Sequence, residues 1–285
     1  MKVDFIAEVS SNHSKNLDRS LEFINSAADI GCDAVKFQLF KIDHLFAPEI
    51  LQKREEIAQR KNWEFPLEFL EPLSEQCKKR FIKFSCTPFY LEAVEELLPY
   101  VDFYKIASYE LLWDGLLAAC AKTGKPIIIS TGMATPEEIQ HAVNVLQTNG
   151  CTDLILLHCT SAYPTPYQEA NLSAIQTIRD LTGCEVGWSD HTVDPGVIHR
   201  SIHRWGAKVI EFHFDLDGKG EEFGAGHCWL PDQIGDVIRQ VNHGIAADGD
   251  GIKAPIELEM KERMWRADPS DGLRPLKSIR ATFTS

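Results

Sequence analysis

Several features that would indicate a membrane, secreted or nucleic-acid-binding protein are absent from this sequence. No apolar run approaches the roughly 18 residues that a membrane-spanning helix needs. The eight cysteines form no Cys-X-X-Cys pair, and Cys86 and Cys159 lie inside apolar runs, a pattern typical of reduced core thiols rather than of a disulfide framework. Positive charge is also scarce, because 29 Lys and Arg stand against 42 Asp and Glu, and the net charge of −13 disfavours a nucleic-acid or anionic-membrane surface. A strand-like run follows almost directly on Met1, so we expect no signal peptide and predict a soluble, cytoplasmic protein.

Short aliphatic and β-branched runs alternate with amphipathic stretches along most of the chain. Runs such as Ile127–Ile129 and Leu154–Leu157 are apolar without interruption, which is typical of strands buried on both faces of a parallel sheet. Eight strands are predicted, at residues 4–10, 33–39, 81–86, 102–108, 126–131, 154–160, 185–190 and 208–216. Eight βα units predict an α/β protein with a single-domain (β/α)8 (TIM) barrel over residues 1–247. An open doubly wound sheet is the lesser alternative, because no Gly-X-Gly-X-X-Gly turn follows a strand.

Two segments depart from this repeat. Residues 40–65 form a long insertion after the second strand, and the sequence leaves open whether it overhangs the barrel mouth and serves the site or forms a solvated helical excursion. Residues 248–285 carry several Gly, Pro and basic residues. We expect them to form a C-terminal extension rather than an independent domain, because they are too few for a substantial second core.

Two stretches, 187–192 and 209–215, are apolar runs that each end in a histidine with an acid nearby. Buried polar groups are costly unless something pairs with them. His191 and His213, at the ends of neighbouring strands, are therefore predicted to hold one divalent cation, because neutral imidazole is a common ligand for such ions. The alternative for each ring taken singly is a core histidine that is hydrogen-bonded to a backbone carbonyl.

Almost every predicted strand carries polar side chains at its carboxyl end, where a (β/α)8 barrel holds its active site. These residues are Glu8, Lys36, Gln38, Ser85, Thr87, Lys105, Ser108, Glu110, Ser130, Thr131, His158, Thr160, Ser189, Asp190, His191, Glu211 and His213. Two lysines and a ring of hydroxyls suit a phosphate and a carboxylate, since lysine supplies charge and hydroxyls supply oriented donors. An unpaired Lys105 in an apolar run would be costly, which favours a functional role for it.

Several of these residues also have structural interpretations. Glu8 could pair with Lys36 on the next strand as a simple bridge. Ser130 could satisfy nearby loop backbone, as small hydroxyl residues often do. Asp190 could do no more than orient the ring of His191, and the sequence leaves these alternatives open.

A series of motifs in consistent order over residues 4–245 resembles the sialic acid synthase family. The motifs are Ile6-Ala7-Glu8-Val9 with Asn12-His13, Val35-Lys36-Phe37-Gln38, Cys86-Thr87-Pro88-Phe89, Tyr104-Lys105-Ile106-Ala107-Ser108 with Glu110, Ser130-Thr131-Gly132-Met133, Leu157-His158-Cys159-Thr160 with Tyr163-Pro164, Ser189-Asp190-His191-Thr192 and Val209-Ile210-Glu211-Phe212-His213-Phe214. The resemblance implies a (β/α)8 enzyme that condenses phosphoenolpyruvate with an N-acylated hexosamine, such as N-acetylmannosamine or its 6-phosphate, to a nine-carbon 2-keto-3-deoxy acid. It also implies a divalent metal, typically Mn²⁺ or Mg²⁺, and a homodimer.

The resemblance also assigns roles to individual residues. It implies that His191 and His213 ligate the metal. Around phosphoenolpyruvate it places Lys36, Thr87, Lys105, Ser108, Ser130 and Ser189, and toward the sugar it places Glu8, Gln38, Glu110 and Tyr163. Within these sets Glu8, Lys36, Lys105 and Glu110 are expected to act in catalysis, and the remaining residues apart from the histidines are expected to bind substrate.

Two departures from the family pattern concern the sugar and the metal. The residues after Asp248 are too few for the antifreeze-like C-terminal domain that the family commonly carries. The motif Gly224-Ala225-Gly226-His227 stands where the family often has Gly-Pro-Asp-His, so an acid near the metal is missing and His227 or water is left to compensate.

Two other functions remain open at this stage. The first is a class I aldolase that forms a Schiff base through Lys36 or Lys105. The second is a non-catalytic barrel that binds sugar acids.

Overall fold

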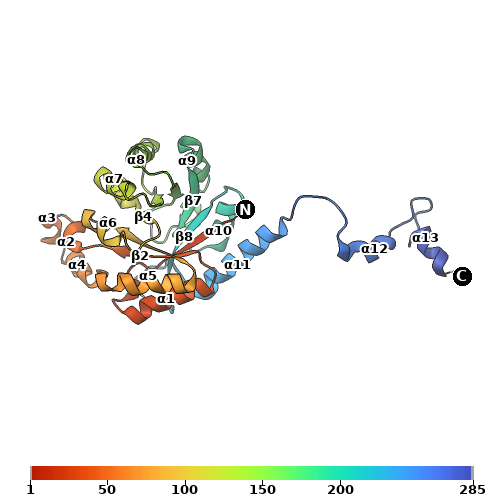
Figure 1. The fold of residues 1–285 in the computed structure, drawn as a ribbon, viewed down its shortest axis with the longest axis horizontal. Helices are drawn as coiled ribbons and strands as arrows, with labels where there is room; N and C mark the ends of the chain where they lie inside the picture. Colours follow the sequence, from red (N-terminus) through yellow and green to blue (C-terminus); the bar gives the residue numbers. More distant parts are fainter. Residues whose placement is uncertain (1, 284–285) are drawn as a thin grey trace. The chain divides into compact units, whose positions relative to one another are not determined.

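The computed structural model describes residues 2–283 and divides the chain into two compact units, Met1–His243 and Gly244–Ser285. Eight parallel strands form the centre of the first unit and are hydrogen-bonded in the order β3-β2-β1-β8-β7-β6-β5-β4 (Figure 1). They are β1 (Asp4–Glu8), β2 (Ala34–Leu39), β3 (Lys83–Pro88), β4 (Tyr104–Ile106), β5 (Ile127–Ser130), β6 (Leu154–His158), β7 (Glu185–Asp190) and β8 (Val209–Phe214). The eight predicted strands are therefore present, with most ends one or two residues inside the predicted bounds.

The sheet closes on itself. Strand β1 pairs with both β2 and β8, which joins the beginning and the end of the strand series. Between β3 and β4 the pairing is reduced to one bridge from Ser85 to Phe103, and Ser85 Oγ donates to the Phe103 carbonyl at 2.9 Å. A short strand, β9 (Cys228–Trp229), adds to β8. This arrangement confirms the predicted (β/α)8 barrel.

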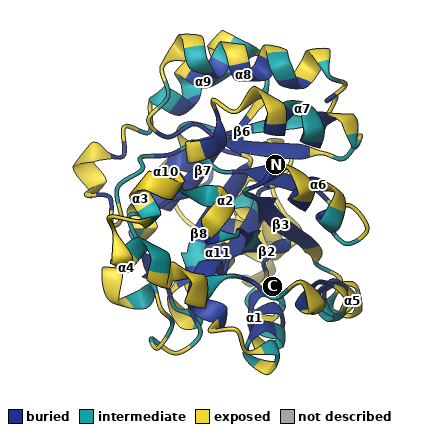
Figure 2. Ribbon diagram, turned by 90° about the vertical axis from the view of Figure 1, so that its left-hand side faces the viewer, coloured by how far each residue is buried: buried dark blue, intermediate teal, exposed yellow. Residues whose placement is uncertain are grey.

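Helices surround the strands. They are α1 (Leu17–Asp29), α5 (Leu70–Arg80), α6 (Leu91–Leu97), α7 (Asp114–Lys122), α8 (Pro136–Thr148), α9 (Ala174–Thr182), α10 (Pro195–His203) and α11 (Pro231–Ala247). Figure 2 shows buried strands at the centre and helices such as α8 and α9 with an exposed outer side. Helix α8 begins with a capping box, because Thr135 Oγ1 accepts the N–H of Glu138 while the Glu138 carboxylate accepts the N–H of Thr135.

Apolar side chains fill the barrel interior. One cluster of buried residues draws on five strands and on the residue just before β4, and consists of Ile6, Ala34, Phe103, Ile128, Leu157 and Val209. Gly187 on β7 is required there, since a Cβ atom at this position would lie 2.3 Å from the carbonyl oxygen of Val209. The interior is thus a packed core rather than a channel.

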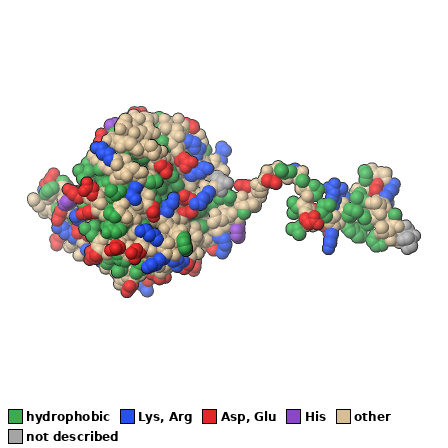
Figure 3. Space-filling model, in the orientation of Figure 1, with side chains coloured by type: hydrophobic (Ala, Val, Ile, Leu, Met, Phe, Trp, Pro, Cys, Tyr) green, Lys and Arg blue, Asp and Glu red, His purple; other side chains and the backbone are tan. Residues whose placement is uncertain are grey.

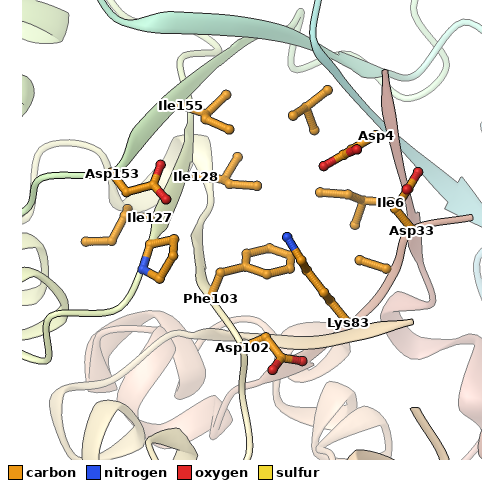
Figure 4. Close-up of a pocket in the computed structure, with 13 residues that line it drawn as sticks. Asp4, Ile6, Asp33, Lys83, Asp102, Phe103, Ile127, Ile128, Asp153 and Ile155 are labelled. Atoms are coloured by element: carbon orange, nitrogen blue, oxygen red, sulfur yellow. The ribbon is translucent and has the colours of Figure 1, made fainter. Parts of the chain in front are cut away.

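The amino-terminal end of the barrel encloses a small cavity of about 100 Å³ (Figure 4). Four aspartates line it, at or just before strand starts: Asp4, Asp33, Asp102 and Asp153. Asp33 accepts the N–H of Phe5 at 2.9 Å. Asp102 likewise accepts the N–H of Phe84 at 2.7 Å. These two acids tie neighbouring strands together, which is a structural role.

The insertion after β2 folds into three short helices, α2 (Ile42–Leu45), α3 (Pro48–Leu51) and α4 (Glu55–Ala58). Phe40 and Ile42 are buried, and Ile42 N–H donates to the Glu64 carboxylate at 2.7 Å. The insertion contributes Phe46, Arg60 and Trp63 to the wall of the large cavity described below. Of the two interpretations of residues 40–65, the structure therefore favours the one that places the insertion over the mouth.

The second unit contains α12 (Met260–Met264) and α13 (Lys277–Arg280). A turn between them is organised by Asp268, whose carboxylate accepts both the N–H and the O–H of Ser270, at 2.9 and 2.6 Å, and the N–H of Lys277 at 2.8 Å. Asp271 pairs with Arg280 at 2.8 Å. That residues 248–285 are an extension rather than a domain stays a prediction.

No helix formed by residues 2–283 is long and apolar enough to cross a bilayer. Acidic and basic side chains are interspersed over the barrel on the face drawn in Figure 3.

Candidate active site

A cavity of about 760 Å³ opens at the carboxyl ends of the strands. All twelve residues predicted for the site line it: Glu8, Lys36, Gln38, Thr87, Lys105, Ser108, Glu110, Ser130, Tyr163, Ser189, His191 and His213. The fold thus brings together side chains that lie up to about two hundred residues apart in sequence, from seven of the eight strands and the loops that follow them. Their individual roles stay predictions.

Lys36 on β2 is 3% exposed and forms a buried ion pair with Glu8 on β1. Its ammonium group also donates to Thr87 Oγ1 at 3.1 Å, and Gln38 Nε2 donates to Glu8 at 2.7 Å. Burial disfavours the charge of Lys36, but the carboxylates of Glu8 and Glu211 outweigh this effect and raise its pKa. Lys36 therefore presents a fixed positive charge to the cavity.

Lys105 on β4 is 2% exposed and has weaker acidic support. Its ammonium group donates to Ser130 Oγ at 2.7 Å and to its own strand at the Ile106 carbonyl, at 3.0 Å. The nearest carboxylate is that of Glu211, at 3.7 Å. Burial lowers the pKa of Lys105, and the positive charge of Lys36 adds to this effect. An anion in the cavity would offset both the burial of the Lys105 charge and its repulsion by Lys36.

Hydroxyl groups and a backbone N–H lie beside Lys105. The N–H of Gly132, just after β5, donates to Ser108 Oγ at 2.9 Å. Ser108 Oγ also lies 3.2 Å from the Cys159 sulfur. Gly132 has no room for a side chain, because a Cβ atom would lie 2.2 Å from Ser161 Oγ and 2.9 Å from Ser108 Oγ. This edge of the cavity can supply oriented donors to an oxyanion.

The rings of His191 and His213 lie on the opposite side, with centroids 5.4 Å apart. His191 Nδ1 lies 2.8 Å from the Thr160 carbonyl, which only accepts, so Nδ1 carries the proton and Nε2 keeps a free lone pair. Burial and the nearby His213 lower the pKa of His191 to about 3, so this ring is neutral. A neutral imidazole with a free lone pair is the form that ligates a metal.

His213 on β8 has a carboxylate partner. Its Nδ1 lies 3.2 Å from Oε2 of Glu222. His227, also buried, lies edge-on to His213 with centroids 4.5 Å apart. His213, Glu222, His227 and Cys228 each offer a donor atom within 4.8 Å of the others, which is close enough for a metal site. Tyr163 packs on His191, with centroids 4.2 Å apart.

Asp190 does not orient His191, contrary to the structural interpretation considered for it. Its carboxylate accepts the indole N–H of Trp188 at 3.0 Å and that of Trp229 at 2.9 Å, and it also accepts the N–H of Thr192 at 3.2 Å. Asp190 therefore caps the turn after β7, and the ring of His191 is oriented by the Thr160 carbonyl instead. Trp229 lies 39 residues from Asp190 in sequence, so this pairing could not be predicted from neighbouring residues.

Two other acids line the cavity, Glu110 in the segment after β4 and Glu211 on β8. Glu110 is buried, and its Oε2 has no hydrogen-bond partner among residues 2–283. Burial raises the pKa of Glu110 to about 7. Glu211 lies beside Ser189, at 3.4 Å, and Lys105. Glu110 is thus an acid that can change protonation near neutral pH.

Glu222 is an acidic cavity residue that sequence reasoning did not identify. It lies in a loop with glycines at 218, 220, 224 and 226, and a second acid, Glu221, stands next to it. In such a loop an acidic side chain is more often solvated than buried. The loop also has no periodic pattern that would show which of Glu221 and Glu222 is buried. The signal that could have found it is the missing acid of the Gly-Ala-Gly-His motif, which leaves a carboxylate to be sought nearby.

The comparisons with known proteins agree with this geometry. A profile of the NeuB family matches residues 23–253. An uncharacterised protein of Methanocaldococcus jannaschii is 39% identical over 258 residues, which cover 89% of this chain and 74% of that protein. The N,N'-diacetyllegionaminic acid synthase of Campylobacter jejuni is 36% identical over 275 residues, covering 91% of this chain and 81% of the synthase.

A solved structure extends the likeness to the fold. The N-acetylneuraminic acid (sialic acid) synthetase of Leptospira borgpetersenii, in complex with citrate, superposes with a TM-score of 0.81 at 30% identity. The match covers 92% of this chain and 90% of that chain. The family match, the relatives and the barrel together show that this chain belongs to the NeuB family, the sialic acid synthase family that its motifs resemble.

Proposed function

We propose that this protein condenses phosphoenolpyruvate with an N-acylated hexosamine to form a nonulosonic (sialic-type) acid, and releases phosphate by cleavage of the C–O bond. The observation that carries this proposal is the pair of buried lysines that faces the same cavity as the cluster of histidines. The relatives support it, since one is named as a synthase of N,N'-diacetyllegionaminic acid and another as a synthetase of sialic acid. The hexosamine is N-acetylmannosamine-like, with or without a 6-phosphate.

The lysines and hydroxyls would bind the anionic substrate. Lys36 with Thr87, and Lys105 with Ser130, already form two hydrogen-bonded donor pairs at 3.1 and 2.7 Å. A phosphate and a carboxylate need several positive or N–H and O–H donors at once. Phosphoenolpyruvate carries both groups, and the net charge of −13 makes such a local basic site necessary.

The donor set on the other side fits a divalent metal. His191 and His213 would hold it, as Mn²⁺ or Mg²⁺, because both rings are buried or nearly so and turn Nδ1 toward a fixed acceptor. When bound, such an ion polarises a carbonyl oxygen.

The side chains of this protein would order the reaction as follows. Carbon C3 of phosphoenolpyruvate attacks the aldehyde carbon of the open-chain sugar, and the aldehyde oxygen takes up a proton from Glu110 in its neutral form. Positive charge then develops at C2, where the Glu8 and Glu211 carboxylates stabilise it. Water adds to C2 and gives up a proton, which Glu110 can accept because its pKa is about 7. The C2 hydroxyl then passes its proton to the departing phosphate as the C–O bond to that phosphate breaks, and Lys36 and Lys105 stabilise the departing anion.

A second function is favoured by one specific observation. The lowered pKa of Lys105 is a property of Schiff-base lysines, so a class I aldolase remains the competitor. Incubation with pyruvate and borohydride separates the two. A trapped adduct on Lys105 supports the aldolase, and no adduct together with phosphate release from phosphoenolpyruvate supports the synthase.

The direct test of the proposed function is a panel of acylated hexosamines with phosphoenolpyruvate and Mn²⁺, with released phosphate as the readout. We expect release that depends on one hexosamine, is lost with a chelator, and is abolished in His213→Ala. Unchanged release in that variant would remove the metal from the proposal. We further propose a cytoplasmic homodimer in which residues 1–247 form the catalytic barrel and 248–285 an extension.

A further inference from the structure

We propose that Glu222 is a positioning residue of the metal site, which holds the His213 ring so that its Nε2 faces the ion. This inference rests on the proposed function for the identity of the ion as a divalent metal. Neither the sequence motifs nor the relatives assign a role to this glutamate.

The contact with His213 carries the inference. Oε2 of Glu222 lies 3.2 Å from Nδ1 of His213, and a carboxylate accepts, so Nδ1 donates its proton, and in the neutral ring Nε2 keeps a free lone pair. His191 is held in the same manner, with Nδ1 against the carbonyl of Thr160. Metal-binding histidines commonly donate their second N–H to a carboxylate or a carbonyl, which fixes the tautomer and the ring plane. The two rings thus present equivalent nitrogens.

Both oxygens of the Glu222 carboxylate have partners within the protein. Ser10 Oγ donates to Oε1, while Oε2 accepts from His213 and lies 3.5 Å from Nε2 of His227. These contacts fix the orientation of the Glu222 carboxylate and, through it, that of the His213 ring. The Cys228 sulfur is engaged as well, since Asn12 Nδ2 donates to it at 3.6 Å.

The backbone that carries Glu222 is itself held in place. Its N–H donates to Asn12 Oδ1 at 2.8 Å, and Asn12 Nδ2 donates to the Phe214 carbonyl at 3.0 Å. Two residues earlier, Gly220 leaves no space for a side chain, because a Cβ atom would lie 2.4 Å from Asn12 Oδ1 and 2.5 Å from Asp215 Oδ1. The loop after β8 is therefore fitted against the turn after β1.

The loop is also fixed from outside the cavity. Arg19 on α1 forms ion pairs with Asp215 at 2.7 Å and with Asp217 at 3.0 Å. Asp215 is fully buried, and a buried acid paired with arginine anchors a loop firmly. A loop anchored at both Asn12 and Arg19 can hold one carboxylate at a set distance from one ring.

His227 supports the same ring from another side. It is 4% exposed, and its Nδ1 has no hydrogen-bond partner among residues 2–283. Its ring lies edge-on to that of His213, at 76°, and so limits the rotation of His213. An unpartnered buried nitrogen at this point is explained by a polar guest, an ion or its bound water, in the cavity.

The test is a titration of the chelator-treated, full-length protein with Mn²⁺, in which the decline of the free-ion electron paramagnetic resonance signal reports binding without substrate. Glu222→Ala removes the acceptor for His213, whereas Glu222→Gln keeps an oxygen that accepts from Nδ1. We expect the affinity for Mn²⁺ to fall about 10- to 100-fold in Glu222→Ala and less than about 5-fold in Glu222→Gln. The neighbouring and exposed Glu221→Gln is the matched control and should bind as the wild type does.

The outcomes separate this inference from the proposed function. Unchanged affinity for Mn²⁺ in Glu222→Ala overturns the positioning role. An equally large loss of affinity in Glu222→Gln also overturns it, because the negatively charged carboxylate would then bind the ion directly. Matching thermal unfolding of the metal-free variants and wild type excludes loss of the fold as the cause. If the affinities follow the expectation but no hexosamine supports phosphate release, the inference stands and the proposed function fails.

Discussion

The ammonium nitrogen of Lys105 lies 2.7 Å from the hydroxyl oxygen of Ser130, on the neighbouring strand β5. Both side chains are buried, and the nearest carboxylate to Lys105 is 3.7 Å away. A buried cation with so little acidic support is costly, and a bound anion would compensate this cost. We therefore expect the pair to act as a receptor for a negatively charged group.

Replacement of Lys105 by Met should remove this receptor. We expect the rate of phosphate release to fall at least about 100-fold, because the departing anion loses a buried donor. Steady-state kinetics with the active hexosamine measure the effect. Lys122→Met, an exposed lysine on α7, is the matched control and should leave the rate unchanged. A near-normal rate in Lys105→Met would remove this lysine from the reaction.

The ion pair between Lys36 and Glu8 predicts a non-additive effect on stability. Lys36→Met leaves Glu8 charged and buried, which should lower the free energy of unfolding by about 3–5 kcal/mol. In Lys36→Met with Glu8→Gln the loss should be smaller, because no uncompensated charge remains. Urea denaturation of the two single variants and the double variant gives the coupling. Additive losses would show that the two side chains do not stabilise each other.

Gly132→Ala tests the donor edge of the cavity. The new Cβ atom would lie 2.9 Å from the Cys159 sulfur and 2.2 Å from Ser161 Oγ, so these side chains must move. Overpacking of this kind costs about 1–3 kcal/mol, and we expect the KM for phosphoenolpyruvate to rise. Gly224→Ala is the control, since a Cβ atom there meets nothing within 4 Å. Equal KM values for phosphoenolpyruvate in the two variants would show that the close packing around Gly132 does not affect substrate binding.

Glu110 predicts a pH-dependent stability. Its pKa is raised from 4.5 to about 7 in the folded protein, so the unfolded chain loses this proton first as the pH rises. The folded state is therefore destabilised between about pH 4.5 and 7, by up to roughly 3 kcal/mol, and the loss persists above pH 7. Glu110→Gln should match the wild type near pH 4 and be more stable at pH 8 in urea denaturation. A constant difference across this range would refute the raised pKa.

The sequence predicted the barrel because its signal is repeated. Uninterrupted apolar runs such as Ile127–Ile129 are typical of strands in a parallel sheet, and eight strand-like segments that alternate with helical ones leave few arrangements. Most positions in the site followed from the barrel, since strand ends at one edge must converge, whereas Tyr163 entered through the family resemblance. Lys36 and Lys105 were therefore placed in one cavity although nearly seventy residues separate them in sequence.

Other parts of the site depend on contacts that leave no local pattern. Glu222 acts on His213 through a loop whose course is set by Asn12 and Arg19, both near the beginning of the chain. The role of Asp190 was likewise set by Trp229, which lies thirty-nine residues further along. The spacing of residues in the sequence predicts helices and strands, but it does not predict which distant residues a loop contacts.

The most direct test of the account is the fate of the bridging oxygen of phosphoenolpyruvate. Substrate labelled with ¹⁸O between C2 and phosphorus is incubated with the protein, Mn²⁺ and the active hexosamine, and the released phosphate is analysed by mass spectrometry. Cleavage of the C–O bond predicts that phosphate carries the label and that the keto oxygen of the product comes from water. Unlabelled phosphate, with the label kept in the product, would contradict the proposed condensation.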